Sequence, residues 1–160
     1  GIAAYERGRW PEALDILDVS REVPPEPARS LLMGASMYVA AAQGDFSAVA
    51  GLEVSRPWWE QEGLVPLLVG SAAIDLYGHA DDLASAVRVH DEVVDALTKI
   101  WYPLFQGQLR LDALLLGQLG SHIQRVPTSE RAALLARGPE LVESAAQVWD
   151  RATSRPGNDE

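Results

Sequence analysis

Residues 5–14 read YERGRWPEAL, and this stretch decides the fold. An apolar helical pattern ends at Gly8, and a second helical pattern begins almost at once with Trp10. The same arrangement returns around Gly44 and, more weakly, around Gly78. Glycine takes a positive φ at little steric cost, so it suits a sharp turn between two helices. The pattern therefore predicts successive pairs of antiparallel helices.

The spacing of these glycines sets a repeat period. Gly44 follows Gly8 by 36 residues, and Gly78 follows Gly44 by 34. Gly117 comes 39 residues after Gly78, so the fourth unit is longer. A period near 34 with two helices per unit is the signature of tetratricopeptide repeats, and the first unit matches it best, through Tyr5, Gly8, Trp10, Ala13, Leu14 and Pro25. We therefore expect an all-α, tetratricopeptide-like, right-handed solenoid of antiparallel helix pairs.

Helical periodicity and turn residues also predict where each helix begins and ends. We expect helices near residues 10–23, 27–43, 46–54, 64–77, 82–99, 101–119, 128–137 and 140–152. The turn glycines should end helices at residues 44, 78 and 117–120, and Gly138-Pro139 should separate the last two helices. Residues 1–152 would form one helical-repeat domain cut from a longer protein, and residues 153–160 a flexible tail.

Composition excludes several classes of function. The chain of 160 residues has a formal net charge of −10, and Lys99 is its single lysine. A nucleic-acid binder needs a basic face to neutralise phosphates, and no basic cluster occurs here. There is no cysteine, no apolar run long enough for a membrane helix and no signal segment. We therefore expect a cytoplasmic protein that, through this segment, binds neither nucleic acid nor membrane.

No pattern in the chain predicts catalysis, a metal site or a cofactor. His79, His90 and His122 form no HxxxH or HExxH pair, and no GxSxG serine elbow occurs. We therefore expect no enzyme activity, no metal and no cofactor. His90 lies on the apolar stripe of its helix and is expected to be a core histidine with its polar atoms satisfied. Asp81 and Asp82 are expected to cap the helix that follows them.

Charged residues inside apolar helices are the leading candidates for a functional site. Asp75, Arg110 and Asp112 interrupt helices that come first in their units, and such helices line the concave face of a solenoid. A buried charge must be paired or must face a water-filled groove. Asp75 and Arg110 would therefore form either a structural ion pair or contacts to a ligand in the groove. The expected groove residues are Tyr38, Asp75, Trp101, Tyr102, Gln106 and Arg110.

Two adjacent tryptophans form a second candidate contact. Trp58 and Trp59 follow a break at Arg56-Pro57. Successive side chains on a helix point in different directions, so both cannot face the same neighbour. We expect one of them to lie in the core and the other to contact a partner.

The start of the chain predicts weak self-association. Ile2, Tyr5 and Trp10 belong to a unit whose first helix begins upstream, so they lack neighbours that a longer chain would supply. Repeat arrays normally protect such an end with a polar capping unit, and none is present. Exposed apolar surface seeks a partner. We expect a weak two-fold homodimer through the first units.

The chain as a whole resembles the helical-repeat region of large LuxR-type transcriptional regulators of actinobacteria. The resemblance rests on residues 4–14 and on the apolar helix 101–120 followed by Gly138-Pro139-Glu140. Such regulators have a nucleotide-binding domain, a tetratricopeptide-like superhelix and a C-terminal helix-turn-helix. The resemblance implies a sensor domain in transcription regulation and signalling. Such a domain would bind a small effector, a protein or the neighbouring domains of its own chain.

A second interpretation stays open. The chain has no GxxxxGK[ST] phosphate loop and no recognition helix of its own. A free-standing tetratricopeptide-like adaptor, binding peptides in its groove and unrelated to transcription, would show the same repeat pattern. Repeat folds host many functions, so the fold by itself does not decide between the two.

Overall fold

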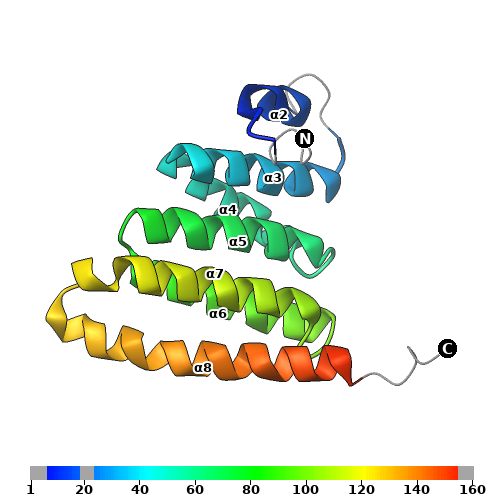
Figure 1. The fold of residues 1–160 in the computed structure, drawn as a ribbon. Helices are drawn as coiled ribbons and strands as arrows, with labels where there is room; N and C mark the ends of the chain where they lie inside the picture. The colour runs from blue at the N-terminus through cyan, green and yellow to red at the C-terminus, as the bar shows by residue number, and fades with distance from the viewer. Residues whose placement is uncertain (1–6, 19–23, 155–160) are drawn as a thin grey trace.

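The computed structural model describes residues 7–18 and 24–154, and it is helical across these ranges, with no β-strand in them. The expectation of an all-α chain is therefore confirmed (Figure 1). The described α-helices are α2 (Trp10–Leu17), α3 (Ala28–Gln43), α4 (Ala50–Ser55), α5 (Leu64–His79), α6 (Leu83–Ile100), α7 (Gln106–His122) and α8 (Thr128–Thr153). Short 3-10 helices are η1 (Phe46–Val49), η2 (Arg56–Trp58) and η3 (Ile123–Arg125). Within the described part of the chain, no helix has the length and apolar character required to cross a bilayer.

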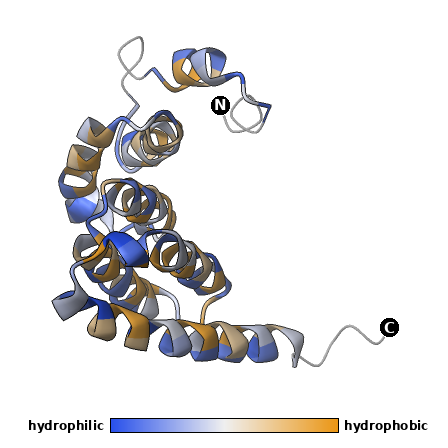
Figure 2. Cartoon of the chain, turned by 60° about the vertical axis from the view of Figure 1, so that its left-hand side comes forward, coloured by the Kyte–Doolittle hydropathy of each residue, from blue (hydrophilic) through white to orange (hydrophobic). Residues whose placement is uncertain are grey.

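The helices stack in chain order. Helix α5 packs between α3 and α7, which lie on either side of it. Helix α6 packs against both α5 and α7, and α8 runs along α7 (Figure 1). Figure 2, a view turned by 60°, shows that the stack curves, with α2 near one end and α8 at the other. Side chains that face neighbouring helices therefore meet in a main core and in a smaller cluster between α2 and α3.

Helix α5 is the centre of the main hydrophobic core. Its sequence is apolar on nearly every side, and Val65, Val69 and Ile74 are fully buried. Most of this helix is buried between its neighbours, because α3, α6 and α7 each cover part of it. A helix without a polar face needs such cover on every side.

A smaller cluster holds α2 against α3. Ala13, Leu17 and Val39 are buried there, and Trp10 packs half-buried against them. The spacing of apolar residues in this segment also predicts Ile16 on the apolar face, but Ile16 is 56% exposed. Among the described residues, α2 packs mainly against α3, and this contact leaves the side of α2 that carries Ile16 uncovered. The expected dimer contacts at residues 2 and 5 lie outside the described residues.

Gly44 ends α3 as expected. Its φ is +72°, and its amide donates to the carbonyl of Ala41 at 3.1 Å. The next amide, of Asp45, donates to the carbonyl of Ala40 at 2.9 Å. This pair of bonds is a Schellman motif, which satisfies the last carbonyls of the helix. Asp45 also caps the following η1 helix, accepting from the Ser47 amide at 3.1 Å.

The expectation that Gly78 ends α5 is wrong. The helix continues to His79, and the left-handed residue is Asp81, with φ of +59°. The Asp81 amide donates to Gly78 at 3.0 Å and the Asp82 amide to Tyr77 at 2.9 Å, the same Schellman pattern as at Gly44. Gly78 instead leaves room for the side chain of Gln118 on α7, which a Cβ atom at position 78 would overlap.

Left-handed residues at three helix turns lie at similar spacing. Gly8, Gly44 and Asp81 have positive φ and are 36 and 37 residues apart, while a fourth, Leu104, lies in the loop before α7. Aspartate tolerates this conformation better than most residues, since its short polar side chain can bond locally. Glycine therefore occupies two of these three left-handed turn positions, and aspartate occupies the third.

Helix α7 begins later and ends later than expected. Residues 101–105 form a loop, because Pro103 lacks an amide hydrogen and Leu104 has a φ of +60°. The helix then runs through Gly117 and Gly120 to His122. A Cβ atom at either glycine would meet nothing within 4 Å, so these glycines occupy open positions on a continuing helix.

Helix α8 is one helix of 26 residues, so the expected break at Gly138-Pro139 is wrong. Proline inside a helix removes one hydrogen bond and costs about 3 kcal/mol. Here Pro139 is exposed, and so is Leu135, whose carbonyl loses its donor and can bond to water. Leu134 and Leu141 pack into the same core on either side of Pro139. This shared contact with the core favours one continuous helix.

Candidate functional site

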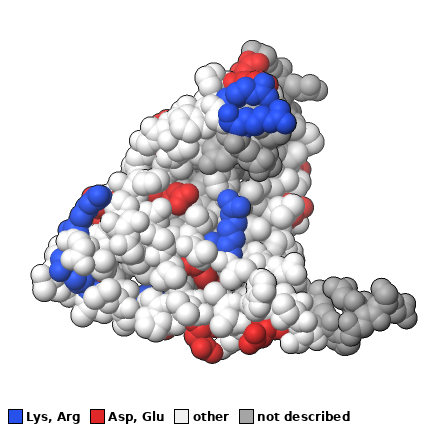
Figure 3. Space-filling view, viewed as in Figure 1, with Lys and Arg blue, Asp and Glu red and all other residues white. Residues whose placement is uncertain are grey.

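Three of the expected groove residues lie together on the face formed by α3, α5 and α7. Tyr38 comes from α3, Asp75 from α5 and Arg110 from α7. The Arg110 guanidinium lies over the Tyr38 ring, 5.3 Å from its centroid, which is a cation–π arrangement. Figure 3 looks onto this face and shows basic and acidic groups close together, set in a largely uncharged surface.

Burial dominates the electrostatics of Tyr38. Desolvation raises the pKa of the Tyr38 phenol above its usual value of 10.0, and the carboxylate of Asp75 acts in the same direction. Hydrogen bonding to Ser71 and the positive charge of Arg110 oppose this rise without cancelling it. The phenol is therefore held in its neutral form, able to donate a hydrogen bond.

Asp75 and Arg110 do not form the structural ion pair that the sequence left open, since no ion pair joins them in the part of the chain described. Asp75 instead accepts a hydrogen bond from Nε2 of Gln118 at 2.8 Å. Arg110 lies eight residues before Gln118, about 12 Å earlier along α7. The register of α7 against α5 therefore brings an amide, and not the guanidinium, to Asp75.

The other three expected groove residues lie near the start of α7. Trp101 and Tyr102 are in the loop before it, and Gln106 is its first residue. Trp101 packs edge-on against Phe105, with ring centroids 5.5 Å apart. The Tyr102 ring lies 4.9 Å from the Arg151 guanidinium of α8. Tyr102 and Gln106 therefore lie together beside α8, while Trp101 packs against Phe105 and Gly63.

The two adjacent tryptophans point in different directions. Trp59 is 6% exposed, and its Nε1 donates to the hydroxyl of Ser55 at 3.0 Å. Trp58 is half-buried and packs against the edge of the same core. Trp59 is therefore a core residue. The side chain of Trp58 remains partly accessible, so Trp58 is the tryptophan that could contact a partner.

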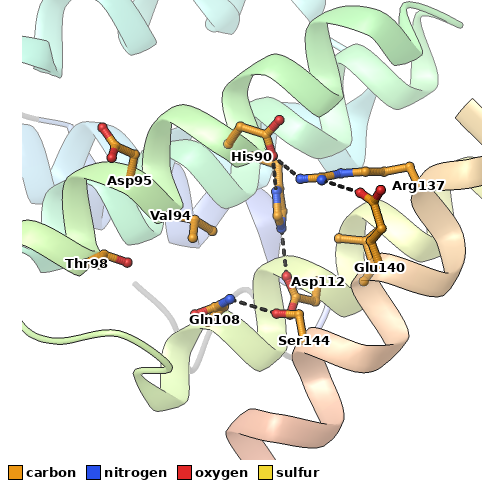
Figure 4. Close-up of a pocket in the computed structure, with 11 residues that line it drawn as sticks. His90, Val94, Asp95, Thr98, Gln108, Asp112, Arg137, Glu140 and Ser144 are labelled. Carbon is orange, nitrogen blue, oxygen red and sulfur yellow. Dashed lines mark hydrogen bonds and ion pairs between the residues drawn. The ribbon is translucent and has the colours of Figure 1, made fainter. Parts of the chain in front are cut away.

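A buried polar network joins α6, α7 and α8 (Figure 4). His90 is 3% exposed and Asp112 is 1% exposed, and His90 Nε2 lies 2.8 Å from Asp112 Oδ1. The hydroxyl of Ser144 donates to the other oxygen of Asp112 at 2.6 Å, and Gln108 Nε2 donates to Ser144 at 2.7 Å. His90 is thus a core histidine with satisfied polar atoms, as expected. The sequence did not reveal its buried partner, because Asp112 lies 22 residues away.

The network continues to the surface through a chain of charges. Nδ1 of His90 lies 3.1 Å from a carboxylate oxygen of Asp91. Arg137 on α8 donates to the same oxygen of Asp91, and also to Glu140 at 2.7 Å. Both ring nitrogens of His90 therefore face carboxylates, so the ring can donate a hydrogen bond whichever nitrogen carries the proton.

A cavity of about 430 Å³ opens beside this network. Its lining residues are His90, Asp91, Val94, Asp95, Thr98, Gln108, Asp112, Arg137, Glu140, Leu141 and Ser144. Four carboxylates and one guanidinium belong to this lining, so negative charge is in excess. Gln108 as a residue is 8% exposed. Its side-chain NH2 group donates to Ser144, and its side-chain oxygen accepts no hydrogen bond from the described residues. The cavity thus offers acceptors for a ligand that carries positive charge and N–H donors.

No family model, curated protein or solved structure matches this chain. Its function must therefore be inferred from the geometry of its sites.

The chemistry of the network favours binding. In a serine–histidine–carboxylate triad the serine hydroxyl is hydrogen-bonded to the histidine, which takes its proton. Here Ser144 donates to Asp112 and not to His90, so the three side chains do not have the order of a triad. Among the described residues, no group of three or more His, Cys, Asp or Glu side chains is arranged to hold a metal ion. The hydrogen bonds of this network join helices α6, α7 and α8.

A second polar cluster ties the α5–α6 turn to the end of α7. Asp81 lies 2.7 Å from Nδ1 of His122 and accepts from Arg125 at 3.0 Å. These two hydrogen bonds lower the pKa of the Asp81 carboxyl below its usual value, with His122 the larger cause. Asp82 caps α6 by accepting from the Ser85 amide at 3.0 Å. Of the expected capping pair, only Asp82 caps, because the left-handed conformation of Asp81 turns its side chain toward α7.

Proposed function

We propose that this chain is the effector-binding arm of a regulatory protein, built as a tetratricopeptide-like right-handed solenoid. Two observations support the solenoid. The left-handed turns at Gly8, Gly44 and Asp81 recur at nearly equal spacing. Helices α3 and α5 precede the turns at Gly44 and Asp81, and α3, α5 and α7 pack one against the next. In this proposal each turn joins the two helices of one repeat unit.

The regulatory role extends the resemblance to LuxR-type transcriptional regulators of actinobacteria. In such a regulator this chain would be the sensor between the nucleotide-binding and DNA-binding domains. The observation that carries the proposal is the cavity bordered by the buried His90–Asp112 pair. Its volume lies in the range of about 300–1,000 Å³ that is usual for small-molecule sites.

The effector that best fits the cavity is a small organic cation. Asp95 and Glu140 line it with carboxylate groups, and the side-chain amide of Gln108 offers a further acceptor. The guanidinium of Arg137 already binds Asp91 and Glu140 there, which shows that these carboxylates accept a planar cation. An ammonium or guanidinium group would gain charge-assisted hydrogen bonds of the same kind.

Binding in this cavity would act on the position of α8. The cavity walls come from α6, α7 and α8, so a ligand contacts all three helices at once. A ligand shifts an equilibrium between two arrangements by its difference in affinity for them. A cation that bridges the carboxylates of α6 and α8 would favour the arrangement in which α8 is docked.

The test is calorimetric titration of the chain with agmatine and putrescine, and with succinate as an anionic control. We expect the two cations to bind and succinate not to bind. Glu140→Gln should weaken cation binding by roughly tenfold, since one charge-assisted contact is worth about 1.5–3 kcal/mol. Glu143→Gln, on the same helix but outside the cavity, should leave it unchanged. Equal binding of succinate, or equal effects of the two substitutions, would contradict the proposal.

The peptide-binding adaptor is the second candidate, and the position of Arg110 favours it. Its guanidinium lies exposed on the face of α3, α5 and α7, stacked on Tyr38, with no carboxylate within ion-pair distance among the described residues. A stacked arginine is well suited to bind a peptide carboxylate. Titration with an acidic peptide tests this alternative, and Arg110→Gln should abolish the binding if the adaptor function holds.

A further inference from the structure

Helix α8 presents an apolar stripe to solvent on the side away from the core. Six exposed residues form this outer stripe: Ala132, Leu135, Pro139, Val142, Ala146 and Trp149. They follow one another at alternating steps of three and four residues. Leu135, Val142 and Trp149, its large members, are 57%, 55% and 60% exposed. Alternating steps of three and four are the pattern by which one helix packs along another.

The outer stripe is distinct from the face that holds α8 to the protein. Leu141 and Val148 point inward and are each 2% exposed. The helix therefore carries two apolar faces, and core packing accounts for only one of them. A continuous exposed apolar patch commonly marks an interaction surface.

Charge beside the outer stripe indicates what kind of helix would cover it. Glu143 and Asp150 lie along its solvent-side edge and form no ion pair with any described residue. On the opposite edge Gly138 and Ala145 are small, so a partner backbone can approach closely. A second copy of this chain would bring the same carboxylates to the interface, and each copy carries a net charge of −10. Like-charge contacts of this kind disfavour a pairing.

We propose that the outer stripe of α8 is the docking surface for an amphipathic helix of a partner protein. The partner helix would carry lysine or arginine beside its apolar face, opposite Glu143 and Asp150. This mode of binding, an apolar helix face covered by another helix, is a common one in peptide recognition. The surface is separate from the effector cavity, because Leu141 and Ser144, which line that cavity, project from the other side of α8.

The test uses two synthetic helical peptides with the same leucine stripe, one edged with lysine and one with glutamate. Fluorescence anisotropy measures their binding to the full chain. We expect the lysine peptide to bind roughly tenfold or more tightly than the glutamate peptide, and to bind more weakly as salt is added. Glu143→Lys combined with Asp150→Lys should reverse the preference.

A matched pair of substitutions locates the surface. Val142→Asp should weaken binding of the lysine peptide by roughly tenfold or more, because it places a charge in the stripe. Val54→Asp on α4 is the control, since Val54 is 59% exposed and lies on another helix. Both positions are exposed, so both variants should fold, and circular dichroism checks this.

Three results would overturn the proposal. The first is equal binding of the lysine and glutamate peptides, or no binding of either. The second is a loss of binding in Val54→Asp as large as that in Val142→Asp. The third is a dimer, seen by light scattering, that Val142→Asp dissociates, since the stripe would then be covered by a second copy of the chain.

Discussion

His90 and Asp112 form a buried pair, with imidazole Nε2 2.8 Å from the carboxylate, although 22 residues separate them in the sequence. Both side chains are almost inaccessible to solvent. Removing one partner of such a pair leaves the other buried without a hydrogen-bond partner. The resulting loss of stability is much larger than the net stabilisation that the intact pair provides. The pair therefore fixes how α6 and α7 lie against each other.

Asp112→Ala should lower the free energy of unfolding by about 3 kcal/mol, because His90 and Ser144 both lose their acceptor. Asp95→Ala is the control, since Asp95 also lines the cavity but is exposed, and among the described residues its one ion pair is with Lys99 on its own helix. That substitution should cost no more than about 0.5 kcal/mol. Guanidinium denaturation measures both values, and similar losses in the two variants would mean that the buried pair is not coupled to folding.

Gly70→Ala should destabilise the chain by about 1–3 kcal/mol. A Cβ atom at position 70 would overlap a methyl group of Val93 on α6 and lie 3.3 Å from its Cβ atom. Valine is stiff and cannot turn away. Gly117→Ala is the matched control, since a Cβ atom there meets nothing within 4 Å, and it should stabilise α7 by about 0.5–1 kcal/mol. Thermal melts compare the two, and effects of the same sign would contradict the close packing of α5 on α6.

Asp81→Asn should reduce thermal stability at neutral pH and have little effect in acid. Hydrogen bonds from His122 and Arg125 lower the pKa of Asp81 from its usual 3.8. A depressed carboxyl pKa stabilises the fold fully above the unfolded pKa, and this contribution is lost as pH falls through the folded pKa. Asparagine also tolerates a positive φ, so the turn itself is preserved. Melting temperatures from neutral pH to below pH 3.8 check this, and a difference independent of pH would show that the charge of Asp81 contributes nothing.

Tyr38→Phe should make the chain more resistant to alkali. Burial raises the pKa of Tyr38 above 10.0, so the native state holds the phenol proton more tightly than the unfolded chain. Stability from such a group is present below the unfolded pKa and is lost as pH rises toward the folded pKa. Ultraviolet absorbance should show one late-titrating tyrosine that the substitution removes. Tyr102→Phe is the control, because Tyr102 is exposed in a loop, and an unchanged titration in Tyr38→Phe would refute the assignment.

The candidate site was predictable only in part. Tyr38, Asp75 and Arg110 stand out because they are polar groups on otherwise apolar helices, and the structure brings them to one face. The cavity between α6, α7 and α8 was not predictable. Ser144 and Gln108 are ordinary polar residues in their own helices, and they become a site only because α8 lies along α7.

The sequence by itself determined the helical class, the burial of α5 and the turn at Gly44. These features depend on local patterns, since apolar periodicity and a residue's tolerance of positive φ act over a few neighbours. Tertiary structure decided that α8 continues through Pro139, that Asp81 and not Gly78 makes the second turn, and that Asp112 pairs with His90. Each of these outcomes depends on the helices that pack alongside, because a buried polar group takes the partner that the neighbouring helix presents to it, and packing along a whole helix outweighs one unfavourable residue.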